Sequence, residues 1–245
     1  MDLAVVRDDM VDSLEHEAKN VVRSDAVAEA MRTVPRHLFV EDERGAYADT
    51  AHEVAGTRVL APSTVARLVE SLDPDPDDAV LIVGAGVGYT AAVLAELVGE
   101  RNVHAVDIDR GIVLEARRNL ARADYEGVLV DRRDGARGLP EYAPFDRVLV
   151  EAAAVRPPRS LLEQLAADGR LVMPIGAQGQ TLTALDAEGE AVERLGTVAF
   201  GPLLVDGEQA SAIERNRTER EEREHARRAA ERRRGWQYDW IDWDG

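Results

Sequence analysis

The chain has 245 residues, a formal net charge of -17 and no cysteine. A chain of this length can bury a full core, so we expect one α/β domain with appendages rather than two large domains. Disulfides, thiolate zinc sites and cysteine nucleophiles are excluded, and the acidic field repels nucleic acid.

No apolar stretch approaches the roughly 20 residues that span a bilayer, and the N-terminus has neither a basic start nor an apolar core. We therefore expect a cytoplasmic protein without a membrane partner. Lys19 is the only lysine among 30 basic residues. An acid-rich, lysine-poor surface suits a high-salt cytoplasm, where self-repulsion is screened over about 3 Å at 1 M salt. GC-rich coding is the alternative, although it does not explain the acid excess.

The N-terminal third is predicted to be helical and irregular. Apolar spacing favours two helices within residues 8–33, separated by an N-cap at Ser24 and Asp25. The segment Val34-Pro35-Arg36-His37-Leu38-Phe39-Val40 breaks this period, and an irregular stretch follows to about Pro62. Residues 63–72 are predicted to form a helix, and the Asp/Pro-rich residues 73–78 a loop.

The most informative feature is a glycine turn between a strand and a helix. The run Val80 to Val83 predicts a strand buried on both faces. Gly84, Gly86 and Gly88 follow, and glycine allows a sharp turn whose N–H groups approach a ligand. A helix over residues 89–98 would direct its positive N-terminal end toward the same place.

An acidic residue completes this unit. The predicted strand over residues 103–106 ends at Asp107, where a carboxylate can accept hydrogen bonds from both ribose hydroxyls. The dinucleotide fingerprint G-x-G-x-x-G has a glycine at its sixth position. That glycine is absent here, where the third glycine stands at the fifth position and Thr90 at the seventh. S-adenosylmethionine, which has no pyrophosphate, fits better than NAD, so methyl transfer is the leading chemistry. Purely structural glycines, or an NAD-dependent oxidoreductase, are the alternatives.

Strands and helices continue to alternate beyond Asp107, which predicts a doubly wound, Rossmann-like α/β sheet. Later strands separated by hairpin turns would close it with antiparallel edge strands. The expected helices are 111–123 and 160–167, and the expected strands are 127–131, 145–150, 169–174, 181–186, 191–195 and 197–204.

The last 35 residues differ in character. Residues 213–234 hold six glutamates and nine arginines, which predicts a solvated helix with opposite charges at helical spacing, a binding arm being the alternative. Trp236, Trp240 and Trp243 follow at intervals of four and three. This stripe would dock either on the chain's own surface or on a partner.

Several segments together resemble the protein-L-isoaspartate O-methyltransferase family, which repairs damaged aspartyl and asparaginyl sites by methylating the isoaspartyl carboxylate with S-adenosylmethionine. The similarity spans most of residues 10–205. It is carried by residues 34–40, Ala46-Tyr47-Ala48-Asp49, the turn at 84–89, Asp134-Gly135 with residues 138–146, and residues 169–176.

The resemblance implies a class I methyltransferase sheet, a protein or peptide substrate with isoaspartyl residues, and a monomer with association through the tail as an alternative. It implies an N-terminal helical and acceptor-loop region at 1–72, a cofactor-binding core at 73–210 and a charged, tryptophan-containing tail at 211–245. The glycines would lie near the methionyl part of the cofactor, Asp107 near the ribose, and Asp134 and Gly135 near the adenine, although Asp134 also suits a purely structural turn. The implied cofactor-binding residues are Gly84, Ala85, Gly86, Gly88, Asp107, Ile108, Asp134 and Gly135.

The acceptor loop departs from the family pattern. The family's Gly-Gln-Thr-Ile-Ser-Gln-Pro corresponds to Gly56-Thr57-Arg58-Val59-Leu60-Ala61-Pro62, which puts Leu60 in place of a serine that positions the acceptor carboxylate. Leucine cannot donate a hydrogen bond. Thr57, Ser63 or Thr64 would supply a hydroxyl if the loop is shifted, and Arg58 can pair with a carboxylate.

The family's acid before the first glycine is also missing, because Ile82 and Val83 stand there. The candidate acceptor-site residues are thus Thr57, Arg58 and Leu60. A carboxylate acceptor needs no general base, so we expect His37 to be structural and His52 not to be catalytic. A methyltransferase fold with a changed acceptor or lost catalysis, acting as an interaction module, is the alternative function.

Overall fold

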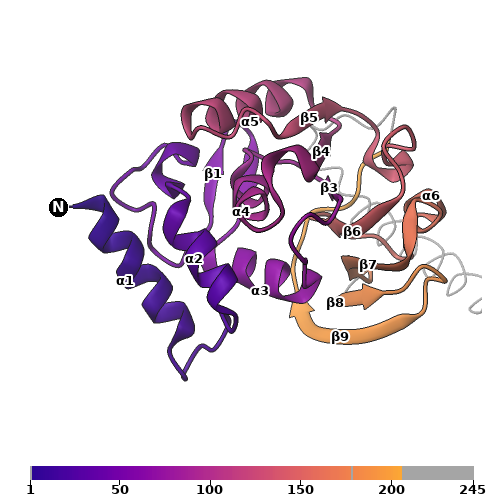
Figure 1. Ribbon diagram of the computed structural model, residues 1–245, viewed down its shortest axis with the longest axis horizontal. Helices are drawn as coiled ribbons and strands as arrows, with labels where there is room; N and C mark the ends of the chain where they lie inside the picture. The colour runs from indigo at the N-terminus through magenta and orange to yellow at the C-terminus, as the bar shows by residue number, and fades with distance from the viewer. Residues whose placement is uncertain (1, 178, 206–245) are drawn as a thin grey trace, which may run out of the picture.

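The computed structural model describes residues 2–177 and 179–205, and its centre is a seven-stranded sheet (Figure 1). The strand order is β5-β4-β3-β6-β7-β8-β9. The first five strands are parallel to one another, β8 pairs antiparallel with β7, and β9 pairs antiparallel with β8. The predicted Rossmann-like sheet with antiparallel edge strands is confirmed. The strands are β3 (Val80–Val83), β4 (Val103–Asp107), β5 (Leu129–Arg132), β6 (Phe145–Val150), β7 (Leu165–Ile175), β8 (Gln180–Leu185) and β9 (Ala191–Val198).

Alternate residues of each strand enter two different cores, as the period of two in a strand requires. Ile82 and Leu149 belong to the larger core, beneath the helices α3 (Pro62–Leu72), α4 (Tyr89–Val98) and α5 (Arg110–Arg122). Val83 and Val150 belong to the smaller core, together with Leu161 of the short α6 (Arg159–Leu162). Both faces of the central strands are therefore covered, which explains their uninterrupted apolar sequences.

The N-terminal segment adds helices to the larger core. The two expected helices are α1 (Leu3–Glu15) and α2 (Asp25–Thr33), and the Ser24 side chain accepts a hydrogen bond from Val27 N, as an N-cap does. Helix α2 packs against α4 (Figure 1). The division of the chain at residues 72 and 210 stays a prediction. The remaining short helices are η1 (Arg36–Phe39), η2 (Glu100–Asn102) and η3 (Gly135–Arg137).

Part of the expected irregular stretch before Pro62 is a hairpin. Strands β1 (His52–Val54) and β2 (Thr57–Val59) pair antiparallel around a two-residue turn, with Val54 opposite Thr57. Ala55 and Gly56 both have positive φ, of 51° and 82°. This is the type I′ conformation that matches the twist of paired strands. An alanine at the first turn position gave no sequence signal, because asparagine or glycine is usual there.

Two expectations near the C-terminal edge were wrong. The helix expected over residues 160–167 ends at Leu162, because Gln164 O accepts a hydrogen bond from Phe145 N and Leu165 already pairs with β6. The two strands expected around Gly196 are one strand, β9, which continues through this glycine at a φ of 92°. Residues 199–204 then leave the edge, and the loop bridges to Ala153 after β6.

The predicted charged helix and the tryptophan stripe lie outside the described residues. Within residues 2–177 and 179–205, no helix combines the length and apolar character needed to cross a membrane.

Candidate active site

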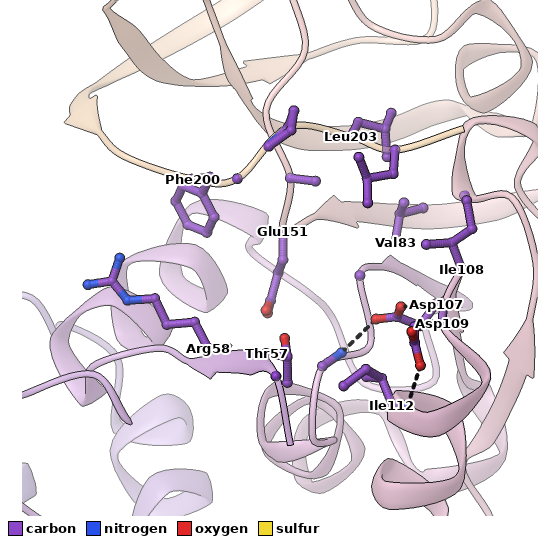
Figure 2. A pocket seen from close by; sticks show the side chains of 18 of the residues that line it. Thr57, Arg58, Val83, Asp107, Ile108, Asp109, Ile112, Glu151, Phe200 and Leu203 are labelled. Carbon is purple, nitrogen blue, oxygen red and sulfur yellow. Dashed lines mark hydrogen bonds between the residues drawn. The ribbon is translucent and has the colours of Figure 1, made fainter. Parts of the chain in front are cut away.

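A cavity of about 620 Å³ opens at the carboxyl ends of β3, β4 and β6 (Figure 2). The strand order reverses at β3, which has β4 on one side and β6 on the other. Ligands of open α/β sheets bind at such a switch point, and this volume is typical of sites for small molecules. Its lining residues are Glu53, Ala55–Arg58, Leu60, Val83, Gly84, Gly86, Val106–Asp109, Ile112, Gly135, Glu151, Ala152 and Ala199–Leu204.

The glycine turn forms the floor of this cavity and is fixed by backbone hydrogen bonds. The N–H groups of Gly84 and Ala85 both donate to Val106 O at 2.9 Å, which ties the turn to β4. Gly86 has a φ of 51°, and a Cβ on it would meet no atom within 4 Å. The backbone therefore faces open space where a ligand can approach closely. Ala85 and Gly88 do not line the cavity; Gly88 instead begins α4 as its N-cap.

Asp107 lies at the cavity wall with its carboxylate already oriented. Oδ2 accepts a hydrogen bond from Gly86 N at 3.2 Å (Figure 2), and Oδ1 accepts one from Asp109 N at 3.0 Å. Burial raises the pKa of Asp107, while these backbone donors lower it. A half-buried acid with fixed oxygens at the end of a strand is suited to accept hydrogen bonds from the hydroxyls of a ligand. Ile108, the next residue, also lines the cavity.

Asp134 and Gly135 have different roles. Asp134 does not line the cavity, and its Oδ1 accepts a hydrogen bond from Ala136 N at 3.0 Å as the N-cap of η3. Gly135 lines the cavity, and a Cβ on it would lie 2.3 Å from Val83 Cγ1. The chain therefore needs a glycine here to pass close to β3. Asp134 holds the turn that places Gly135, which favours the structural alternative for its side chain.

The hairpin β1–β2 forms the opposite wall. Thr57, Arg58 and Leu60 all line the cavity, with Arg58 exposed and the other two partly buried. The three acceptor-loop candidates thus face the glycine turn and Asp107 across one cavity, although they lie more than 20 residues away in sequence. Leu60 also packs against the larger core, so its side chain contributes an apolar contact there.

A buried arginine holds this wall in place. Arg36 is fully buried, with its Nε donating to Ala46 O at 2.8 Å and its Nη2 donating to Leu60 O at 2.7 Å. Its guanidinium also lies 4.6 Å from the centroid of the Tyr89 ring, a cation–π contact with the first residue of α4. One side chain therefore links the segment 34–40, the loop after β2 and the first residue of α4. The function of Arg36 could not be deduced from its place in the sequence.

The neighbouring His37 is outside the cavity. Its Nδ1 is 2.7 Å from the Tyr47 hydroxyl, and burial lowers the pKa of its imidazole. This contact joins two segments of the loop region and supports the structural role expected for His37.

Sequence reasoning missed two parts of the cavity. Glu151 follows β6 directly, as Asp107 ends β4, so an acid after an apolar strand was a signal that went unused. The loop over residues 199–204 was predicted as a strand, and it instead runs along the rim with Phe200 and Leu203 facing the cavity (Figure 2). Its position depends on hydrogen bonds to Ala153, including Ala153 N to Gly201 O at 2.7 Å.

This geometry agrees with the comparison to known families. The model of the protein-L-isoaspartate(D-aspartate) O-methyltransferase family matches residues 6–209. The chain belongs to this family. Among curated members, the protein-L-isoaspartate O-methyltransferase of Roseiflexus sp. strain RS-1 is 43% identical over 210 residues, covering 83% of this chain and 94% of that protein. The Aeropyrum pernix member is 45% identical over 205 residues, covering 80% and 78%.

Solved structures give the same fold. A crystal structure of a Plasmodium falciparum protein assigned to this family, in complex with S-adenosyl-L-homocysteine, superposes with a TM-score of 0.72 at 22% identity. It covers 81% of this chain and 98% of its own. A second protein-L-isoaspartate O-methyltransferase has a TM-score of 0.69 at 27% identity, covering 80% of this chain and 67% of its own.

Proposed function

We propose that this protein transfers the methyl group of S-adenosylmethionine to the carboxylate of L-isoaspartyl residues in proteins and peptides. The observation that carries the proposal is one cavity in which the glycine turn and Asp107 face the acceptor hairpin. Membership of the family gives that arrangement its chemistry.

The cofactor side of the cavity fits S-adenosylmethionine. Gly84 and Gly86 leave space along the backbone for the methionyl part, and Asp107 presents a fixed carboxylate for the ribose. Ile108 and the Gly135 backbone form the wall proposed for the adenine, whereas Ala85, Gly88 and Asp134 would support this site from behind. When bound, the cofactor supplies an electrophilic methyl group on a sulfonium centre.

The chain's part in the reaction is positioning. An isoaspartyl carboxylate is ionised at neutral pH and is already a nucleophile, so the site needs no general base. Rate enhancement then depends on holding its oxygen in line with the methyl group. Arg58 provides a positive charge at the hairpin, and Thr57 provides the one side-chain hydroxyl among the described residues that line the cavity.

Labelled methyl transfer would test this function. The purified protein is incubated with labelled S-adenosylmethionine and either an isoaspartyl peptide or the matching aspartyl peptide, in molar potassium chloride. We expect base-labile label on the isoaspartyl peptide alone. Binding of S-adenosylhomocysteine without label on either peptide would instead favour a changed acceptor, the alternative function.

We also propose that the surface is adapted to high salt. The support is a net charge of -17 with a single lysine. Repulsion among these acids should destabilise the fold at low ionic strength, so the midpoint of thermal unfolding should rise from low to molar salt. Equal midpoints of thermal unfolding in low and in molar salt would contradict the proposal. The cytoplasmic location and the monomeric state stay predictions, to be checked by cell fractionation and by light scattering.

A further inference from the structure

Glu151 is an acid in the cavity to which the site described above gives no role. It follows the last residue of β6, and its N–H donates to Val83 O at 2.8 Å. A Cβ on Gly84 would lie 3.4 Å from Glu151 Cβ, so the acid stands beside the first glycine of the turn. Figure 2 shows its side chain pointing from the strand end into the cavity.

One oxygen of the Glu151 carboxylate lacks a hydrogen-bond partner. Oε1 is inaccessible to solvent and accepts no hydrogen bond from any described residue. The pKa of Glu151 is raised to about 7, mainly by burial and also by the charge of Asp107, while the Thr90 side chain in α4 lowers it. The ionised form of this acid is costly in the protein alone, because no compensating charge is paired with it.

Among residues 2–177 and 179–205 the missing charge has few sources. Asp107 and Asp109 of the neighbouring strand end and Glu53 of the hairpin are acidic, while Arg58 is the one cation among the described residues that line the cavity. Arg58 is exposed and makes no ion pair with Glu151. The acceptor is itself an anion, so an ionised Glu151 would repel it. A cationic group of the cofactor is the complement.

We propose that Glu151 binds the α-ammonium group of the methionyl part of S-adenosylmethionine, and so replaces the acid that the family pattern has before Gly84. This inference rests on the proposed cofactor site. Side chains at Ile82, Leu149 and Glu151 share one face of the sheet by the alternation of strand residues. Since β3 and β6 are adjacent, with Ile82 opposite Leu149, an acid two residues beyond Leu149 reaches the same side of the glycine turn.

The test is a titration of S-adenosylhomocysteine into the full chain and into Glu151→Gln, which keeps the size of the side chain. A second probe is the analogue in which hydrogen replaces the α-amino group. We expect Glu151→Gln to weaken binding of S-adenosylhomocysteine about 10-fold or more, the range of a charged hydrogen bond. Its affinity for the deaminated analogue should equal that of the wild type within about twofold.

Glu188→Gln is the matched control, because it removes the same charge from an exposed residue in the turn between β8 and β9. This turn lies at the opposite end of the sheet from the cavity. The wild-type affinity for S-adenosylhomocysteine should also rise between about pH 5.5 and about pH 7.5 as Glu151 ionises, while the α-ammonium, with a pKa of about 8 or higher, stays charged. Glu151→Gln should abolish most of that rise.

Equal loss of affinity for both probes, or no loss for either, would overturn the inference. A loss of isoaspartyl peptide affinity with normal binding of S-adenosylhomocysteine would overturn it as well and would assign Glu151 to the acceptor. Methyl transfer is measured separately. A wild type that binds S-adenosylhomocysteine but methylates no isoaspartyl peptide would contradict the proposed function, while the comparison of the two probes still decides the role of Glu151.

Discussion

The two walls of the cavity are positioned by different means. The wall proposed to bind the cofactor, here called the cofactor wall, consists of strand ends and a turn whose backbone is bonded to β4, as in the paired hydrogen bonds from Gly84 and Ala85 to Val106 O. The acceptor wall is a hairpin of two three-residue strands, and the loop that leaves it is held by side chains: Arg36 donates to Leu60 O, and Asp49 accepts a hydrogen bond from Ser63 N. Geometry on the first wall is thus a property of the sheet, whereas geometry on the second depends on side-chain contacts, including the buried charge of Arg36.

Removing that charge should have the largest effect. Arg36→Met leaves the carbonyls of Ala46 and Leu60 without their donor, so we expect the free energy of unfolding to fall by about 3 kcal/mol or more. Methyl transfer should fall further than affinity for S-adenosylhomocysteine, because the acceptor wall loses a hydrogen bond to its backbone, whereas the cofactor side loses only the contact with the Tyr89 ring. Urea unfolding, calorimetric titration and peptide methylation measure the three quantities.

Arg117→Met is the matched control for this substitution. Arg117 Nε also donates to a backbone carbonyl, Val130 O, at 2.8 Å, but its side chain is half exposed. We expect a loss below about 1 kcal/mol. If both variants lost equal stability, or if Arg36→Met weakened S-adenosylhomocysteine binding as much as methylation, the two walls would not be independent.

On the cofactor wall, Glu151→Gln should stabilise the ligand-free protein at high pH. The pKa of this acid is raised to about 7 in the fold from an ordinary value of 4.5, so the folded state holds the proton more tightly. Its contribution to stability is therefore lost as pH rises from about 4.5 to about 7. The variant should exceed the wild type by about 2 to 3 kcal/mol at pH 8 and match it near pH 4.5. Equal stability at pH 8 would mean that the carboxylate is compensated in the free protein.

Asp107→Ala should weaken cofactor binding without disturbing the hairpin. Loss of a charge-assisted hydrogen bond to the ribose predicts about 1 to 3 kcal/mol in the affinity for S-adenosylhomocysteine. At saturating cofactor, KM for an isoaspartyl peptide should stay near the wild-type value. Asp131→Ala, in the adjacent strand β5 and outside the cavity, is the control. Unchanged affinity in Asp107→Ala would remove this residue from the site.

Leu60→Ser should have the smallest effect, and it acts on the acceptor wall alone. If the hairpin keeps the family geometry, the new hydroxyl should raise kcat/KM for an isoaspartyl peptide by about 3- to 10-fold, the value of one neutral hydrogen bond. Leu60→Ala removes the same apolar bulk without adding a donor and should give no gain. A gain in both variants would assign the effect to space in the cavity rather than to hydrogen bonding.

The difference between the walls also decided what the sequence could predict. Periodicity located β3, α4 and β6 with their bounds, because each is a regular element with a continuous apolar face. The place of Asp107 at the cavity could be predicted because it ends such a strand. The β1–β2 hairpin was missed, since its strands are short and its turn begins with Ala55.

The wrong prediction of a helix over residues 160–167 has a related cause. Residues 165–167 suit a helix by composition, yet Leu165 pairs with Phe145 at the start of β6, and this pairing is a tertiary effect. The place of Glu151 directly after β6 was visible in the sequence, but its unpaired oxygen beside Gly84 depends on the chain around it, and no spacing in the sequence reports that.

The contact between Arg36 and the carbonyl oxygen of Leu60 has an evolutionary consequence. Every amino acid has that carbonyl, so Arg36 fixes the course of the loop whatever side chain the position carries. Substitutions at residue 60 can therefore change the chemistry presented to the cavity while the main chain stays in place. The chain can carry a leucine here in place of a serine, and so change what lines the cavity, without first losing its fold.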